Sequence, residues 1–109
     1  MPGLARAGAA DVVGVALRRN ADGSLDIAVT IRSADTGWQR YADRFEILAP
    51  DGRVLGVREL LHPHEDEQPF TREITGLRLP PGVTEIVVRA HMKGVGYDGA
   101  TRRVAVPPR

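Results

Sequence analysis

The chain has 109 residues, with 15 Lys and Arg against 14 Asp and Glu for a formal net charge of +1, and it contains no cysteine. The length favours one domain, the missing cysteines exclude a disulfide framework and thiolate chemistry, and the balanced charge argues against a dedicated binder of nucleic acid or anionic membranes. No run of about eighteen apolar residues is present, so the sequence predicts no membrane-spanning helix.

The first ten residues are rich in alanine and glycine and show no alternating pattern. Ala5-Arg6-Ala7 has the small-x-small form that precedes signal-peptidase cleavage, but these residues contain no long apolar segment. We therefore expect residues 1–10 to be a loose tail or the remnant of a removed signal peptide. A single domain is expected over residues 11–107.

Alternation of apolar and polar residues dominates the rest of the chain. In "SLDIAVTIR" (24–32) and "TEIVVRAHM" (84–92), every second residue is apolar, which is typical of a half-buried strand. Asp-Gly or Pro-Gly pairs in 20–24, 50–53 and 80–84 mark tight turns. The pattern predicts seven strands, at about 11–18, 24–33, 42–49, 53–61, 69–78, 84–93 and 100–106.

No segment shows a helical stripe, and seven short strands in about 100 residues favour an all-β, immunoglobulin-like or fibronectin-III-like sandwich. "ITGLRLPPGVTEIVVRA" (74–90) resembles the E–F corner of fibronectin-III domains, with Glu85 where those domains usually place a tyrosine. Aromatic residues make up only 5% of the chain. Phe45, Phe70 and aliphatic side chains are therefore expected to fill the core.

Chain reversal predicts where the unusual residues gather. Connections between consecutive antiparallel strands alternate between the two ends of a sandwich. Segments 34–42, 62–70 and 93–100 therefore fall at one end. They contain the only tryptophan, both tyrosines, two of the three histidines and the acidic run 65–67. Loops on a rigid scaffold often carry binding chemistry, so this end is the candidate site.

A metal site is one interpretation of this end. In an extended segment, residues i and i+2 point the same way, so His62 and His64 could face one ion, with an oxygen from residues 65–67. His91 could join from its strand, whereas Met92 is expected in the core. Copper or zinc would suit such ligands, although a lone His-x-His is a weak signal.

Catalysis finds less support. Histidine beside carboxylates could act as a general base, but no cysteine exists and no serine lies in an elbow motif. The alternative is a structural network in which Arg58, Arg72 and Arg89 pair with carboxylates and the histidines bind backbone carbonyls. We expect no enzyme.

Recognition of another molecule is the remaining interpretation. Trp38, Tyr41 and Tyr97 are residue types that anchor interfaces. The glycines of "GVGYDG" (94–99) allow conformations that other residues cannot adopt. Each ring could equally cover only its own loop.

Four strings resemble a family of small, exported, uncharacterised bacterial domains: "DTGWQRYADRFEI" (35–47), "DGRVL" (51–55), "HPHEDEQPFTR" (62–72) and "VVRAHMKGVGYDG" (87–99). The resemblance implies export and a shared site, but no reaction. Trp38 stands where the family pattern has cysteine, so no thiol role carries over. The positions that carry over are Asp35, Tyr41, His62, His64, Glu67, Gln68, Arg72, Arg89 and His91.

We therefore predict an exported binding or structural module, in the periplasm or at the cell surface. Its ligand would be a protein or a small molecule. Copper or zinc at His62, His64 and His91 is the alternative. The predicted binding patch comprises Asp35, Trp38, Tyr41, His62, His64, Glu67, Gln68, Arg72, Arg89 and Tyr97.

Overall fold

The computed structural model describes residues 8–108. This part of the chain contains seven strands, and each begins and ends within two residues of its predicted bounds. They are β1 (Asp11–Arg19), β2 (Leu25–Arg32), β3 (Ala42–Leu48), β4 (Val54–Glu59), β5 (Phe70–Leu77), β6 (Glu85–Met92) and β7 (Arg102–Ala105). Within the described residues, no helix is long and apolar enough to cross a membrane.

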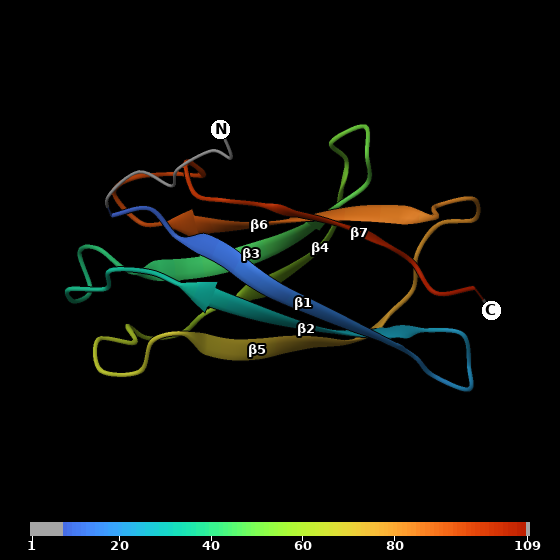
Figure 1. The fold of residues 1–109 in the computed structure, drawn as a ribbon, viewed down its shortest axis with the longest axis horizontal. Coiled ribbons are helices and arrows are strands. Elements are labelled where there is room, and N and C mark those ends of the chain that lie inside the picture. Colours follow the sequence, from blue (N-terminus) through green and yellow to red (C-terminus); the bar gives the residue numbers. More distant parts are fainter. Residues whose placement is uncertain (1–7, 109) are drawn as a thin grey trace.

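The strands form two antiparallel sheets that pack as a β-sandwich (Figure 1). One sheet has the order β1-β2-β5 and the other has the order β4-β3-β6-β7. The fourth strand therefore extends the sheet of β3, and β3 and β6 are the two central strands of that sheet.

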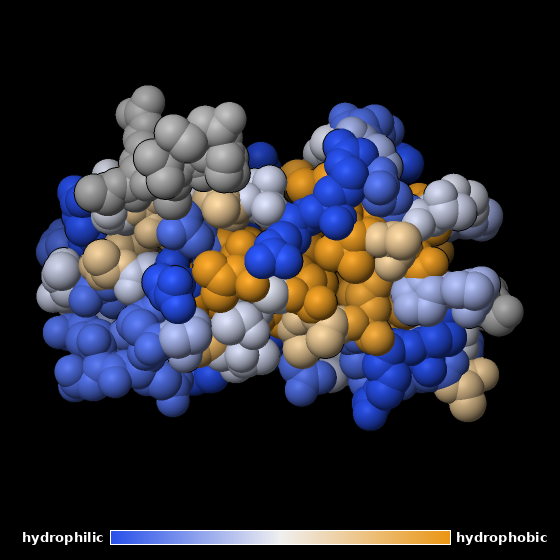
Figure 2. All heavy atoms as spheres, in the orientation of Figure 1, coloured by the Kyte–Doolittle hydropathy of each residue, from blue (hydrophilic) through white to orange (hydrophobic). Residues whose placement is uncertain are grey.

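Period-two alternation explains the core. Leu25, Ile27, Val29 and Ile31 of β2 are fully buried, and Ile86, Val88, Ala90 and Met92 of β6 face them from the other sheet. Phe45 and Phe70 are 0% and 2% exposed, which confirms both as core residues. On the face seen in Figure 2, apolar side chains gather over the middle of the molecule, whereas the loop end at the left is largely hydrophilic.

The three predicted segments lie at one end of the sandwich, as expected (Figure 1). The loops 33–41, 60–69 and 93–101 join β2 to β3, β4 to β5 and β6 to β7. We call this end the loop pole. The opposite end carries the short turns of the chain, because every strand reverses the direction of the one before it.

The start of β1 is tied to the 93–101 loop. The amide of Val12 donates to the carbonyl of Ala100 at 2.8 Å, and the amide of Ala100 donates to Oδ1 of Asp11 at 2.8 Å. A Cβ atom on Gly99 would lie 1.7 Å from the carbonyl oxygen of Ala10, so only glycine fits there.

The predicted tail at residues 1–10 lies largely outside the described residues, which begin at Gly8. Ala9 and Ala10 are 5% and 0% exposed. The packed part of the chain therefore begins before β1.

Candidate functional site at the loop pole

Asp35 links two of the three loops. It is 8% exposed, and its Oδ1 accepts hydrogen bonds from the Ser33 hydroxyl at 2.6 Å and from the Ala42 amide at 3.1 Å. Its Oδ2 accepts from the backbone amide of His64 at 2.8 Å. One carboxylate therefore satisfies two backbone donors that would otherwise be buried without partners.

Gln68 also links the end of β2 to the 60–69 loop, and it does so by accepting one hydrogen bond and donating another. Its Oε1 accepts from the Ser33 amide at 2.8 Å, and its Nε2 donates to the His64 carbonyl at 2.8 Å. The peptide bond between Gln68 and Pro69 is cis. We call Ser33, Asp35, His64, Gln68 and Arg72 the Asp35 cluster, and its hydrogen bonds fasten the 60–69 loop to the end of β2.

His64 is the buried centre of this cluster. It is 5% exposed, and its ring stacks on Phe70 with centroids 3.9 Å apart and an interplanar angle of 10°. Arg72 Nη2 lies 2.9 Å from His64 Nε2, and because a guanidinium can only donate, Nε2 must accept. Burial, with a smaller effect from the charge of Arg72, lowers the pKa of His64.

The neutral ring of His64 must then carry its proton on Nδ1. That atom is buried without a hydrogen-bond partner among the described residues. The predicted hydrogen bond from this ring to a backbone carbonyl is therefore wrong. His62 is exposed, and its Nδ1 lies 3.1 Å from the carbonyl of Pro63.

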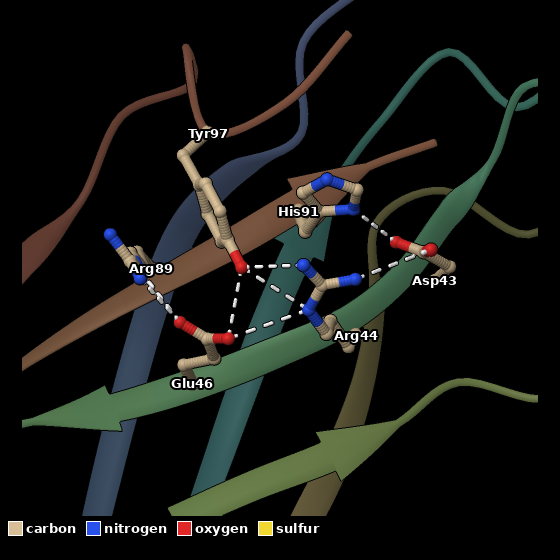
Figure 3. Close-up of polar contacts among 6 residues, drawn as sticks. All are labelled: Asp43, Arg44, Glu46, Arg89, His91 and Tyr97. Atoms are coloured by element: carbon tan, nitrogen blue, oxygen red, sulfur yellow. Dashed lines mark hydrogen bonds and ion pairs between the residues drawn. The ribbon is translucent and has the colours of Figure 1, made fainter. Parts of the chain in front are cut away.

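A second cluster lies on the outer face of the sheet that contains β3 and β6 (Figure 3). Glu46 is 7% exposed and accepts hydrogen bonds from Arg89 Nε at 2.8 Å and from the Tyr97 hydroxyl at 2.9 Å. Arg89 Nη2 lies 2.7 Å from the same carboxylate. Arg89 therefore pairs with a carboxylate, but both of its contacts go to Oε1 of Glu46 and not to one oxygen each, so the pair is not bidentate at the carboxylate.

Tyr97 folds from the 93–101 loop onto this face. Arg44 Nη2 donates to the Tyr97 hydroxyl at 2.6 Å, and the guanidinium of Arg89 lies 3.9 Å from the centroid of the Tyr97 ring. Burial acts to raise the pKa of Glu46. The hydrogen bonds from Arg89, Tyr97 and Arg44 outweigh burial, so that pKa is below its ordinary value. We call Asp43, Arg44, Glu46, Arg89, His91 and Tyr97 the Glu46 cluster.

The three histidines do not share one site. His62 and His64 lie together, with ring centroids 4.6 Å apart. His91 lies in the Glu46 cluster, where its Nδ1 is 2.6 Å from Asp43 Oδ1 and its ring meets Tyr97 edge-on. Between residues 8 and 108, no group of three or more histidine, aspartate or glutamate side chains could hold a metal ion. The placement of His91 follows from alternation, because Met92 faces the core.

Trp38 lies at the tip of the 33–41 loop. The amide of Thr36 donates to the carbonyl of Arg40 at 3.0 Å, and the amide of Arg40 donates to the carbonyl of Gly37 at 3.2 Å. These bonds close residues 36–40 into a tight turn, which we call the Trp38 turn. Trp38 is 60% exposed, and its ring meets Tyr41 edge-on at a centroid distance of 5.7 Å.

Four residues of these clusters were not singled out from the sequence: Ser33, Asp43, Arg44 and Glu46. A signal for two of them was present in "RFEI" (44–47), where Arg44 and Glu46 alternate with the core residues Phe45 and Ile47. In the structure, Arg44 pairs with His91 and Glu46 pairs with Arg89 across neighbouring strands. Strand order was needed to bring those partners together.

The chain is 40% identical over 90 residues to a protein from Halomicrobium mukohataei that is named "Putative lipoprotein". The matched region covers 83% of this chain and 44% of that protein, so the chain spans less than half of that relative's length. No family model matches the chain, and no solved structure matches it.

Proposed function

We propose that this domain is an exported binding module that presents the loop pole to a partner. The observation that carries the proposal is Trp38, the only tryptophan of the chain, which is 60% exposed on a turn closed by two backbone hydrogen bonds. A large apolar ring held in water contributes little to folding, because its burial is incomplete. Rigid exposed aromatics are typical of binding sites, since little conformational entropy is lost on binding.

The two polar clusters support a scaffolding role for the residues beneath the surface. Asp35, Gln68 and Glu46 each bind two or more groups from different segments of this chain. Hydrogen bonds of this kind order loops, and they occupy the oxygens of Asp35 and Glu46. They also support the structural role that the sequence suggested for Arg89 and Arg72.

Export has support from the relative described above, which is named "Putative lipoprotein" and to which the chain is similar. A lipoprotein is held at a membrane surface, and a domain of that kind would act in the periplasm or at the cell surface. The absence of cysteine is compatible with such a compartment.

The finer fold assignment that we propose is a fibronectin-III-like member of the immunoglobulin-like sandwiches. Constant-type immunoglobulin domains place their fourth strand in the sheet of the first two strands. Here β4 pairs with β3 instead, in the sheet β4-β3-β6-β7. The seven-strand count and the alternation of loop ends support the same assignment.

Copper or zinc binding is the weaker alternative. His64 Nε2 is engaged by Arg72, and His91 is engaged by Asp43 in a separate cluster. Only His62 keeps an exposed imidazole. A shift in the melting temperature on adding Cu(II) or Zn(II), lost in His62→Ala, would favour this alternative.

Co-sedimentation with cell envelopes of the source organism tests the proposed function. We expect the domain to sediment with envelopes and Trp38→Ala to lose most of that binding while its melting temperature is unchanged. Val54→Ala is the matched control, because Val54 is a half-exposed apolar residue that begins β4 near the opposite end. Equal sedimentation of the wild type and Trp38→Ala would refute the proposed function.

A further inference from the structure

The loop pole carries three cationic side chains that have no hydrogen-bond or ion-pair partner among the described residues. Arginines elsewhere in the domain are engaged: Arg53 with Asp51, Arg78 with Asp22 and Arg103 with Glu85. In contrast, the side chains of Arg32, Arg40 and Lys93 make no hydrogen bond or ion pair with any residue from 8 to 108. Each of these three residues lies at the end of a strand or loop at the loop pole.

One of the three cations, Lys93, lies beside an aromatic ring, and Arg40 belongs to the Trp38 turn with its Nη1 beside Gly8. Arg40 closes the Trp38 turn, and Lys93 follows β6 directly. The Lys93 amide donates to the carbonyl of Tyr41 at 2.9 Å, and its ammonium lies 5.7 Å from the Tyr41 ring. We call Trp38 and Arg40 of the Trp38 turn, together with Tyr41 and Lys93, the basic-aromatic strip, because these residues lie on two loops that touch. A Cβ on Gly94 would lie 3.5 Å from the carbonyl of Gln39, so the two loops touch.

The third loop has the opposite charge. Glu65, Asp66 and Glu67 are all exposed on the 60–69 loop, and among the described residues only Glu67 of these three has a cationic partner, Arg72 at 3.4 Å. The loop pole thus has a basic-aromatic part and an acidic part. An anionic partner must therefore contact the basic-aromatic part without coming close to the acidic 65–67 run.

This division favours a narrow anionic polymer over the other classes of partner. A membrane surface would bring its anionic headgroups against the 65–67 run, and Trp38 and Leu61, the large exposed apolar residues described at the loop pole, are a small anchor for a bilayer. A stable protein interface needs roughly 800 Å² per partner with an apolar centre. Gln39 and Arg40, which adjoin Trp38 in the turn, are instead polar and exposed.

A sugar ring matches the strip in size and chemistry. Its C–H face packs on an indole, and its hydroxyl groups can bind the Gln39 amide, which has no hydrogen bond within the described residues. Carboxylates along the polymer would neutralise Arg40 and Lys93, and guanidinium binds carboxylate in a bidentate manner.

We propose that the basic-aromatic strip binds an acidic polysaccharide, with a sugar ring on Trp38 and uronate carboxylates at Arg40 and Lys93. This inference rests on the proposed function, since it names the partner of the same surface. It concerns a polymer with carboxylates on its sugar rings, and neutral glucans are excluded by the charge requirement.

Calorimetric titration with polygalacturonate, alginate and hyaluronan tests this inference, with dextran as the neutral comparison. We expect binding to at least one acidic polymer and none to dextran. Trp38→Ala should weaken binding about tenfold, as for a central aromatic contact. Arg40→Gln and Lys93→Gln should each weaken it about threefold and reduce its salt dependence. Arg78→Gln is the matched control, an exposed arginine at the other end, and should bind as the wild type does.

The contrary outcomes are distinct. Absence of binding to every one of the three acidic polymers, or equal binding to dextran, overturns the inference. So does preferential binding to vesicles that contain phosphatidylglycerol, or envelope binding that is abolished by protease treatment of the envelopes. The proposed function survives each of these results as long as Trp38→Ala still loses envelope binding, so the two failures can be told apart.

Discussion

Removal of the Asp35 carboxylate should destabilise the domain, because Asp35 links the 33–41 loop to the 60–69 loop. The substitution Asp35→Ala takes away the acceptor of the Ser33 hydroxyl and of the Ala42 and His64 amides. A buried donor left without a partner costs about 1–3 kcal/mol, and two backbone donors are affected. Because water can reach part of the emptied space, we expect a loss of about 3 kcal/mol in the free energy of unfolding.

A loss of that size corresponds to a fall of about 12–24 °C in melting temperature for a domain of about 100 residues. Urea and thermal denaturation followed by circular dichroism measure both quantities. The exposed Asp66 in the neighbouring loop provides the control, because Asp66→Ala should change stability by less than about 0.5 kcal/mol. The stability loss of Asp35→Asn should lie between those of Asp35→Ala and Asp66→Ala, since the asparagine amide keeps one acceptor oxygen. If Asp35→Ala lost less than about 1 kcal/mol, the assignment of Asp35 as the link between the loops would be wrong.

Three further substitutions probe the rest of the molecule. Tyr97→Phe should destabilise the domain by about 1 kcal/mol in urea denaturation, because Glu46 loses a buried hydroxyl donor while the ring contacts remain; an unchanged midpoint would contradict this. Gly99→Ala should lower the free energy of unfolding by about 3 kcal/mol or more, because its Cβ would lie 1.7 Å from a backbone oxygen. Gly14→Ala is the control and should be tolerated, since a Cβ there would lie 3.5 Å from its nearest neighbour. Equal melting temperatures of the two variants would contradict the close approach at Gly99. The lowered pKa of His64 means that the unfolded chain takes up a proton at higher pH than the folded chain. Stability should therefore be complete above the unfolded pKa of about 6.5 and fall as the pH drops below it, and His64→Gln should remove that slope between pH 7 and 5. A slope of the same size in His64→Gln would show that another group causes it.

The sequence by itself determined the strands and the direction of the chain. Alternation in 24–32 and 84–92 identified the core residues of β2 and β6, because only one face of each strand is buried. Turn residues between the alternating segments set the number of reversals. The number of reversals then placed the 33–41, 60–69 and 93–101 loops at one end, independently of which strands pair.

Only the tertiary structure decided which side chains meet. His62, His64 and His91 are alike in the sequence, yet one is exposed, one is buried against Phe70 and one binds Asp43 on another face. Periodicity gives the side of a strand on which a residue lies, but not its neighbour on the next strand. The pairing of β3 with β6 joined Glu46 to Arg89, and the packing of two loops joined Asp35 to His64, because hydrogen bonds depend on distances across the fold.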